Sequence, residues 1–169
     1  MKHELEKISP YLFPNPALLI SCKSSNKESI ITLSWVGTSC SEPPMISVGI
    51  RPTRYSYNII KESGEFVINV PTSEMIEKVK FCGTKSGKDV DKWMECNFTR
   101  EKPSKVNTPL IKECPVNIEC TVKKIIELGS HHLFIAEIVA VHMDENWRKS
   151  KYEGMLTYSL GQYGKTVPL

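Results

Sequence analysis

Apolar residues along the chain recur with the period of β-strands. "ALLISCK" (17–23) and "ESIITLSW" (28–35) are β-branched and apolar, and the polar "SSNK" between them predicts a hairpin. "PMISVGI" (44–50) predicts a third strand, with Pro43 and Pro44 at its entry, where a missing N–H does least harm. "EFVINV" (65–70) predicts a fourth. The longest β signal, 116–143, predicts two strands joined at "GSHH", the second apolar on both faces and therefore covered on both.

Short helical patterns interrupt these strands. Thr53 or a neighbouring residue is expected to cap a helix over 54–63 that ends at Gly64. Thr72 and Ser73 predict the start of a helix over 74–81, and "CGTKSGKDVDKW" (82–93) reads as a loop that runs into a short helix. Six or more strands joined mostly by hairpins predict a mainly β protein, a closed antiparallel barrel with short flanking helices, and not a βαβ sheet.

Composition and charge narrow the class of protein. The 169 residues are 40% hydrophobic and 24% charged, which predicts a single globular domain over 1–169. The net charge is only +3, and the basic residues are scattered along the chain without a long basic run, so nucleic acid is not an expected partner. The start of the chain lacks an apolar stretch and nothing approaches eighteen apolar residues, so we expect a soluble, cytoplasmic protein without a membrane span.

Cysteine and histidine residues offer two further chemistries. The six cysteines are separated by 18, 42, 14, 18 and 6 positions and form no C-x-x-C pair, so we expect reduced thiols and no metal site. Cys40 and Cys82 lie in small-residue segments, with His131, His132 and His142 as conceivable partners for a thiol nucleophile. Sequence alone shows no such contact, and adjacent histidines in a strand face opposite sides.

Hydroxyl and basic residues cluster more tellingly around the second and third strands. Thr32 and Ser34 are expected on one face of the second strand, with Trp35 on the other and Thr38 in the next loop. Hydroxyls with Arg or Lys suit a phosphate monoester, although an ordinary solvated surface has the same composition. Neither G-x-G-x-x-G nor G-x-x-x-x-G-K-[ST] is present. After the third strand come the remaining residues of this kind: Arg51, Arg54, Ser56, Lys88 and Lys92.

Three blocks of the sequence, taken together, resemble one family. They are "IITLSWVGTSCSEPPMISVGIRPTRYSYNIIKESGEFVINVPT", "FCGTKSGKDVDKW" and "CPVNIECTVKKIIELGSHHLFIAEIVAVHMDE". In this order they resemble the flavin reductase-like, FMN-binding split-barrel family, particularly its flavoredoxin-type members, over about residues 10–145. The resemblance implies a Greek-key-like split β-barrel, a homodimer with FMN near the subunit interface, and either NAD(P)H:flavin reductase activity or electron transfer to a redox protein. The alternative is a non-enzymatic flavin-binding or storage module.

The resemblance also implies roles for individual residues. It places His131 near the pyrimidine side of the ring as a tuning group, makes Lys92 the first choice for a phosphate or flavin contact, and requires no catalytic triad. The family's C-terminal tail is shortened here to "LTYSLGQYGKTVPL", of which Tyr158, Gly161 and Tyr163 fit the start. The implied contacts with ring or ribityl are Thr32, Ser34, Trp35, Thr38 and Cys40; those of backbone amides with the ring edge are Ser47, Val48, Gly49 and Ile50; those near the phosphate are Arg51, Arg54, Ser56 and Ser86.

Overall fold

A seven-stranded antiparallel sheet forms the body of the protein. The computed structural model describes residues 1–150 and 153–167. The strands follow the order β3-β2-β6-β9-β10-β5-β4 across the sheet. Their bounds are β2 (Leu18–Lys23), β3 (Glu28–Leu33), β4 (Val36–Ser41), β5 (Pro44–Ile50), β6 (Glu65–Val70), β9 (Val116–Glu127) and β10 (His132–Met143).

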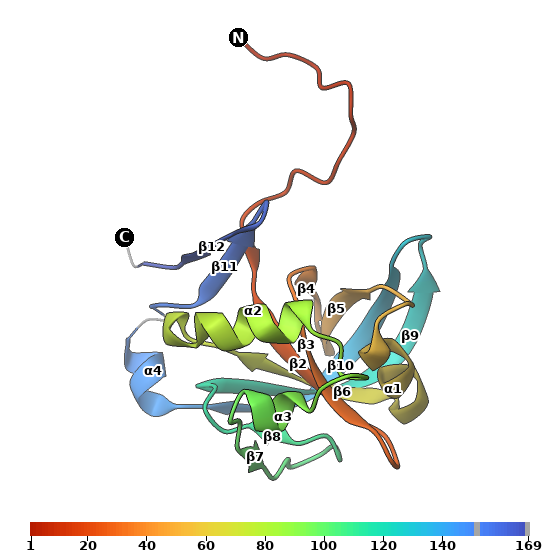
Figure 1. The fold of residues 1–169 in the computed structure, drawn as a ribbon, viewed down its shortest axis with the longest axis vertical. Helices are drawn as coiled ribbons and strands as arrows, with labels where there is room; N and C mark the ends of the chain where they lie inside the picture. The colour runs from red at the N-terminus through yellow and green to blue at the C-terminus, as the bar shows by residue number, and fades with distance from the viewer. Residues whose placement is uncertain (151–152, 168–169) are drawn as a thin grey trace.

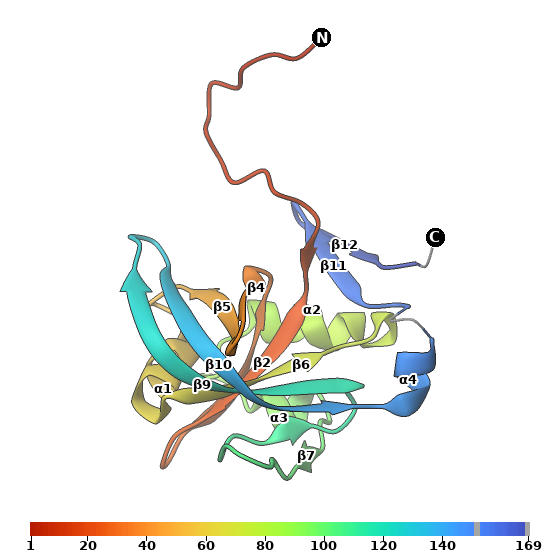
Figure 2. The ribbon, with the colours of Figure 1, turned by 180° about the vertical axis from the view of Figure 1, so that it is seen from behind.

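The two edges of this sheet belong to consecutive strands. β3 and β4 lie at opposite edges, yet only Ser34 and Trp35 separate them in sequence. The sheet must therefore curl so that its two edges come close together. The Gly49 N–H donates to the Trp35 carbonyl at 2.9 Å, which extends the β4–β5 ladder to the point where the chain crosses over from β3. The result is the predicted antiparallel split barrel, seen from two sides in Figures 1 and 2.

The apolar pattern located most of these strands correctly. All four predicted single strands and both members of the 116–143 pair are present. The segment after Trp35, expected as a loop, is instead the edge strand β4. Its residues are polar and largely exposed, so they lack the apolar alternation of a half-buried strand, but register with β5 from Val36↔Val48 to Ser41↔Pro44 makes it one.

Four helices and one 3₁₀ turn accompany the sheet in the part of the chain that the structure describes. α1 (Tyr55–Ser63) ends, as predicted, at Gly64, which adopts a left-handed φ of 69°. Thr53 does not cap it: Arg54 occupies the N-cap position without a side-chain cap. The 3₁₀ turn η1 (Ser73–Met75) leads into α2 (Ile76–Thr84), which continues three residues beyond the predicted end. α3 (Lys92–Glu95) and α4 (Glu145–Lys149) complete the set.

Two apolar cores stabilise opposite faces of the strands. Inside the barrel, Ile20, Ile68, Phe66 and Phe134 pack against α1 with other fully buried side chains. On the outer face, Leu19 and Ile30 of β2 and β3 pack against α2 and α3. Because α2 and α3 cover β3 from outside, the loop between these helices is held close to that strand (Figure 1).

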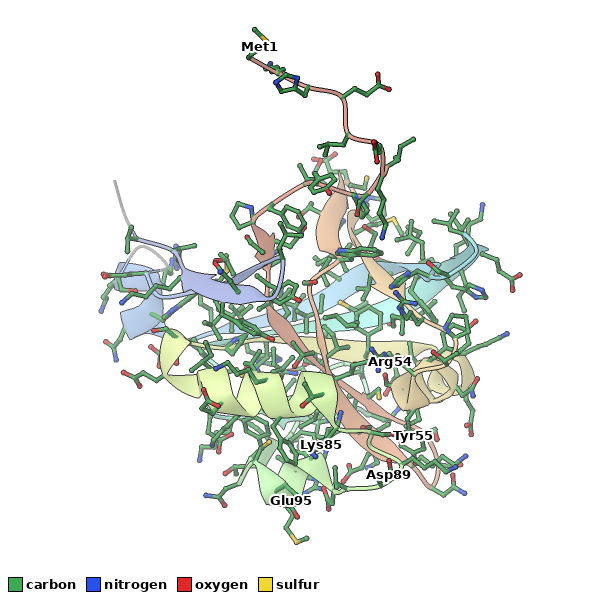
Figure 3. The ribbon with its side chains drawn as sticks, turned by 45° about the horizontal axis from the view of Figure 1, so that its top comes forward. Met1, Arg54, Tyr55, Lys85, Asp89 and Glu95 are labelled. Carbon is green, nitrogen blue, oxygen red and sulfur yellow. The ribbon has the colours of Figure 1, made fainter. Side chains whose placement is uncertain are left out.

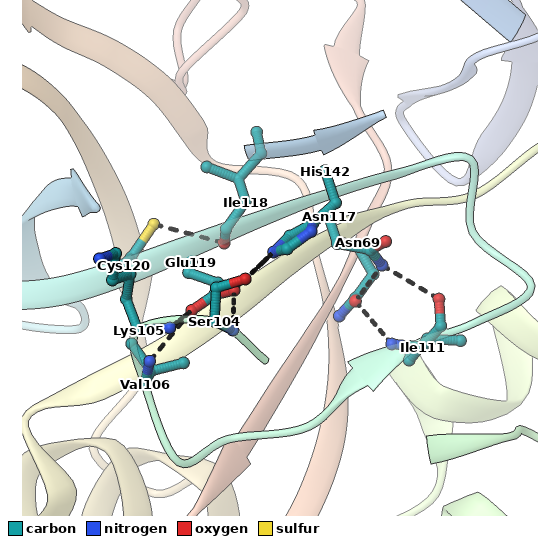
Figure 4. A network of polar contacts seen from close by, with 10 residues as sticks. All are labelled: Asn69, Ser104, Lys105, Val106, Ile111, Asn117, Ile118, Glu119, Cys120 and His142. Atoms are coloured by element: carbon teal, nitrogen blue, oxygen red, sulfur yellow. Dashed lines mark hydrogen bonds and ion pairs between the residues drawn. The ribbon is translucent and has the colours of Figure 1, made fainter. Parts of the chain in front are cut away.

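A buried carboxylate anchors the irregular segment between β7 (Arg100–Glu101) and β8 (Leu110–Ile111). Glu119 of β9 is fully buried. Burial alone would raise the pKa of Glu119, but hydrogen bonds to its charged form outweigh burial and lower it. The donors to Glu119, which are drawn in Figure 4, are the backbone N–H groups of Ser104 (2.7 Å), Lys105 (2.6 Å) and Val106 (3.0 Å) and the His142 ring (2.6 Å).

Strands from near the beginning and near the end of the chain pair with each other beside α2. β1 (Asn15–Pro16), β11 (Leu156–Ser159) and β12 (Gln162–Lys165) form a small sheet, in which β1 pairs with β11. The residues before β1 run outward from the body (Figure 2). Within residues 1–150 and 153–167, no helix is long and apolar enough to cross a membrane.

Candidate functional site

A small cavity of about 160 Å³ lies where α1, β3 and the α2–α3 loop meet. Arg54 and Tyr55 from the start of α1 and Lys85 from the end of α2 border it, and Figure 3 shows the three side chains from these elements. The complete lining is Ser29, Ile30, Ile31, Thr53, Arg54, Tyr55, Ser56, Cys82, Gly83, Thr84, Lys85, Ser86, Gly87 and Lys92.

Two glycines allow the α2–α3 segment to approach β3 closely. A Cβ on Gly83 would lie 3.2 Å from the Cβ of Thr32, and one on Gly87 would overlap the hydroxyl of Ser29. The Thr32 hydroxyl also donates to the Val79 carbonyl at 2.6 Å, which ties α2 to the strand. The floor of the small cavity is therefore set by backbone packed directly on β3.

Ser56 points to an anion as the ligand of the small cavity. Its hydroxyl is buried and finds no hydrogen-bond partner among the described residues, although buried polar groups are nearly always paired. Ser56 lies in the first turn of α1, where the helix dipole favours negative charge, and the next N–H group, that of Tyr57, already donates to the Arg54 carbonyl at 3.0 Å. No side chain caps this end of the helix. A phosphate oxygen would supply the missing acceptor.

Lys92 lies at the floor of the same cavity. Its ammonium donates to the carbonyls of Ile30 and Cys82, both at 2.7 Å, and the residue is buried. Burial lowers the pKa of Lys92. The structure thus brings Lys92 to the cavity that Arg54, Ser56 and Ser86 also line, and its two hydrogen bonds join β3 to α2; contact of these residues with a cofactor stays a prediction.

A larger cavity of about 640 Å³ adjoins the small one, and Arg54, Gly83 and Thr84 line both. Three cations, Arg51, Arg54 and Lys80, surround it, and none of the described residues lining it is acidic. Tyr158 and Tyr163 from β11 and β12 border it on another side. The complete lining is Ala17, Thr32, Ser34, Trp35, Arg51, Arg54, Lys80, Gly83, Thr84, Tyr158, Gly161 and Tyr163.

Trp35 faces this larger cavity together with Thr32 and Ser34. The expectation that Trp35 lies on the opposite face is wrong, because β3 ends at Leu33 and strand alternation no longer applies beyond it. The Trp35 ring is 44% exposed and its centroid lies 4.4 Å from that of His131. Burial, and then the charges of Arg51 and Arg54, lower the pKa of His131, so its ring is favoured in the neutral form.

Other predicted contacts lie away from both cavities within one chain. Thr38 and Cys40 are exposed on the edge strand β4, and Ser47 donates its hydroxyl to Gly37. Val48 and Ile50 are buried in the barrel core, while Gly49 packs beneath Trp35. β5 is paired with β10 on one edge and β4 on the other. That the backbone amides of this strand face the edge of a flavin ring stays a prediction.

Several lining residues were not singled out from the sequence. Gly83, Thr84 and Lys85 were assigned to a loop, and Lys80 to a helix without a role at the site. The run "GTKSG" between two glycines was the available signal for a close backbone approach. For Lys80, only the packing of α2 on β3 places the side chain beside the cavity.

The fold defines the class of protein as a split barrel, and the family that its sequence matches supports a flavin-related oxidoreductase. A family model described as a flavin reductase like domain matches residues 11–166. The chain belongs to this family, so the resemblance seen in the sequence is confirmed, and the match extends through the tail.

Known relatives agree with this assignment. An uncharacterized protein of Archaeoglobus fulgidus is 36% identical over 89% of this chain and 85% of its own length. Flavoredoxin from Methanosarcina acetivorans is 30% identical, with a TM-score of 0.87 over 99% of this chain and 94% of that chain. Flavoredoxin of Desulfovibrio vulgaris (Miyazaki F) is 27% identical, with a TM-score of 0.90 over 100% of this chain and 95% of that chain.

Proposed function

We propose that this chain is an FMN-dependent oxidoreductase, which either accepts hydride from NAD(P)H or exchanges electrons with a redox protein. The observation that carries the proposal is the buried, unpartnered hydroxyl of Ser56 at the open N-terminus of α1. Lys92 at the floor and Arg54 at the rim add positive charge around it. These groups fit a phosphate monoester, which they would bind by charge-assisted hydrogen bonds.

The larger cavity is suited to the ring of the same cofactor. It shares Arg54, Gly83 and Thr84 with the small cavity, so a ligand anchored by its phosphate extends directly into it. Trp35 offers an aromatic face and Thr32 and Ser34 offer polar groups along one side. When bound, FMN supplies the hydride-accepting chemistry at N5. The chain's own residues bind the phosphate, orient the ring and leave one side accessible.

Charge around the larger cavity supports an anionic electron donor. Arg51, Arg54 and Lys80 create a positive potential that attracts a dinucleotide phosphate and raises its association rate. The His131 ring, favoured in its neutral form and tilted by 42° against the Trp35 ring, provides a hydrogen-bonding group without adding a further charge. Positioning carries most of the catalysis in hydride transfer, so the site requires no acid–base residue.

We further propose that two chains form a homodimer in the cytoplasm. Leu133 and Ile135 alternate with the buried Phe134 and Ala136 on β10 and so face away from the barrel core. Farther along β10, Val141 is 53% exposed. An apolar outer face of this kind gains stability when a second copy covers it. Light scattering during size-exclusion chromatography tests the dimer, and a monomer at micromolar concentration contradicts it.

Ser56→Ala is the direct test of the phosphate assignment. Losing one hydrogen bond to a charged group costs about 1.5–3 kcal/mol, so the dissociation constant for FMN should rise roughly 10- to 150-fold. Binding of riboflavin, which has the same ring and no phosphate, should change little. Ser24→Ala is the matched control, because the Ser24 hydroxyl is also buried without a described partner but lines neither cavity.

The titrations follow flavin fluorescence quenching. Equal FMN affinity in Ser56→Ala and the unchanged protein would contradict the phosphate assignment. Stopped-flow mixing of the FMN-loaded protein with NADH, NADPH or a reduced redox protein then tests the activity. Flavin that binds but is reduced by none of these would identify a binding or storage module instead.

A further inference from the structure

Two buried thiols lie within reach of each other beside the small cavity, which one of them, Cys82, lines. The Sγ atoms of Cys82 and Cys96 are 3.7 Å apart, and both residues are buried. A disulfide requires about 2.05 Å, so the sulfurs must approach by roughly 1.7 Å. Cys82 belongs to the last turn of α2, and Cys96 is the C-cap residue of α3. Their spacing of 14 positions gave no hint of this contact in the sequence.

The pair encloses the segment that builds much of the small cavity. Residues 83–95 lie between the two cysteines and include Gly83, Ser86, Gly87 and Lys92, all of which line it. Cys82 lines the cavity itself, and its carbonyl accepts a hydrogen bond from Lys92. Cys82 is 1% exposed, so a reagent reaches its thiol only when the residues around it, including those that line the cavity, move apart.

We propose that Cys82 and Cys96 are a reversible dithiol–disulfide pair that a peroxide oxidises when the small cavity is open and that a bound phosphate group protects. This inference rests on the proposed function for the identity of the protecting ligand. The formation of a disulfide between the two thiols does not depend on that ligand, and it is tested on protein without flavin.

The reaction balances with hydrogen peroxide as the oxidant. The Cys82 sulfur, as thiolate, attacks one peroxide oxygen; the O–O bond breaks, a sulfenic acid forms and one water leaves. The Cys96 sulfur then attacks the Cys82 sulfur, the S–S bond forms and a second water leaves. In total two thiols lose two hydrogens and one peroxide becomes two waters. A thiol reductant reverses the step by exchange.

The pKa shifts of both thiols link their reactivity to burial. Burial raises the pKa of both thiols, which keeps them protonated and slow to react while they are covered. The Lys92 ammonium close by opposes that effect and stabilises a thiolate at Cys82. Opening of the cavity admits water and peroxide and removes part of the burial cost.

The experiment compares flavin-free and loaded protein during exposure to hydrogen peroxide. Mass spectrometry of peptides, digested after free thiols are alkylated, should show a Cys82–Cys96 cross-link in the flavin-free protein that dithiothreitol removes. FMN at 100 times its dissociation constant should slow cross-linking about 100-fold, because only about one molecule in a hundred remains open. Inorganic phosphate should also protect, whereas riboflavin, which lacks the phosphate, should not.

Variants separate this pair from the other thiols. Cys96→Ser should abolish the cross-link, while Cys120→Ser, at a buried thiol inside the barrel, should leave its rate unchanged. Absence of a cross-link in flavin-free protein, or a cross-link from Cys82 to Cys114, overturns the inference, and both results come from unaltered protein. Equal protection by FMN and riboflavin would overturn the claim that a bound phosphate group protects the two thiols. Failure of FMN to bind would instead count against the proposed function.

Discussion

Gly87→Ala should damage the small cavity by forcing the α2–α3 loop off β3. The added Cβ would overlap the hydroxyl of Ser29 and lie 3.0 Å from both the Ser29 Cβ and the Tyr55 ring. Carbon atoms pack best at about 3.5–4.0 Å, so the loop must move by roughly 0.5–1 Å. Overpacking of this kind lowers the free energy of unfolding by about 1–3 kcal/mol. Alanine also reduces the conformational freedom of the unfolded chain, which raises the free energy of unfolding by about 0.4–1 kcal/mol. We expect a net loss of about 1–2 kcal/mol in the free energy of unfolding.

Urea denaturation measures this loss, and FMN titration measures its effect on the site. Gly37→Ala is the matched control, since a Cβ there meets no atom within 4 Å, and its free energy of unfolding should change by less than about 0.5 kcal/mol. In the double variant with Ser29→Ala, removal of the hydroxyl should recover about 0.5–1 kcal/mol as a coupling energy. Two additive single effects, or a Gly87→Ala protein as stable as the original, would refute the packing argument.

Two further predictions concern buried charges. Lys92→Met should weaken FMN binding by about 1.5–3 kcal/mol, whereas Lys88→Met, at an exposed lysine that lines neither cavity, should leave the FMN titration unchanged; equal affinities would remove Lys92 from the site. The pKa of Glu119 is lower in the folded protein than its unfolded value of about 4.3, so Glu119 adds stability above that pH which is lost as pH falls through the folded pKa. Urea midpoints between pH 6 and pH 3 should therefore fall less steeply in Glu119→Gln, and parallel curves for the two proteins would contradict this role.

Sequence patterns predicted those parts of the fold that local chemistry determines. Apolar runs located β2, β3, β5, β6, β9 and β10, and Gly64 ended α1 where a left-handed residue was needed. β4 was not predicted because this edge strand is defined by its pairing with β5 and not by an apolar pattern of its own. The two strands are joined by a turn. Trp35 was assigned to the wrong face for a related reason: the periodicity of β3 continues in the sequence by one or two residues beyond the real strand.

The candidate site was predictable in its residue types and not in its assembly. Arg54, Ser56, Ser86 and Lys92 do line one cavity, but the sequence does not show which cations converge. Tyr158 reaches the larger cavity only because β11 pairs with β1, which lies more than a hundred residues earlier. The same holds for the contact between Cys82 and Cys96, which depends on how α2 and α3 pack together on β3.

β3 acts as the scaffold of the small cavity, which three of its residues line. Its Ile30 carbonyl holds Lys92, its Thr32 hydroxyl holds α2, and its Ser29 contacts the backbone at Gly87. In a glycine-rich phosphate loop, the loop itself holds the backbone that binds the phosphate. Here β3 holds the backbone of the α2–α3 segment instead. Substitutions in β3 should therefore alter phosphate affinity in proportion to how far they move the α2–α3 segment, even where the substituted side chain never meets the ligand.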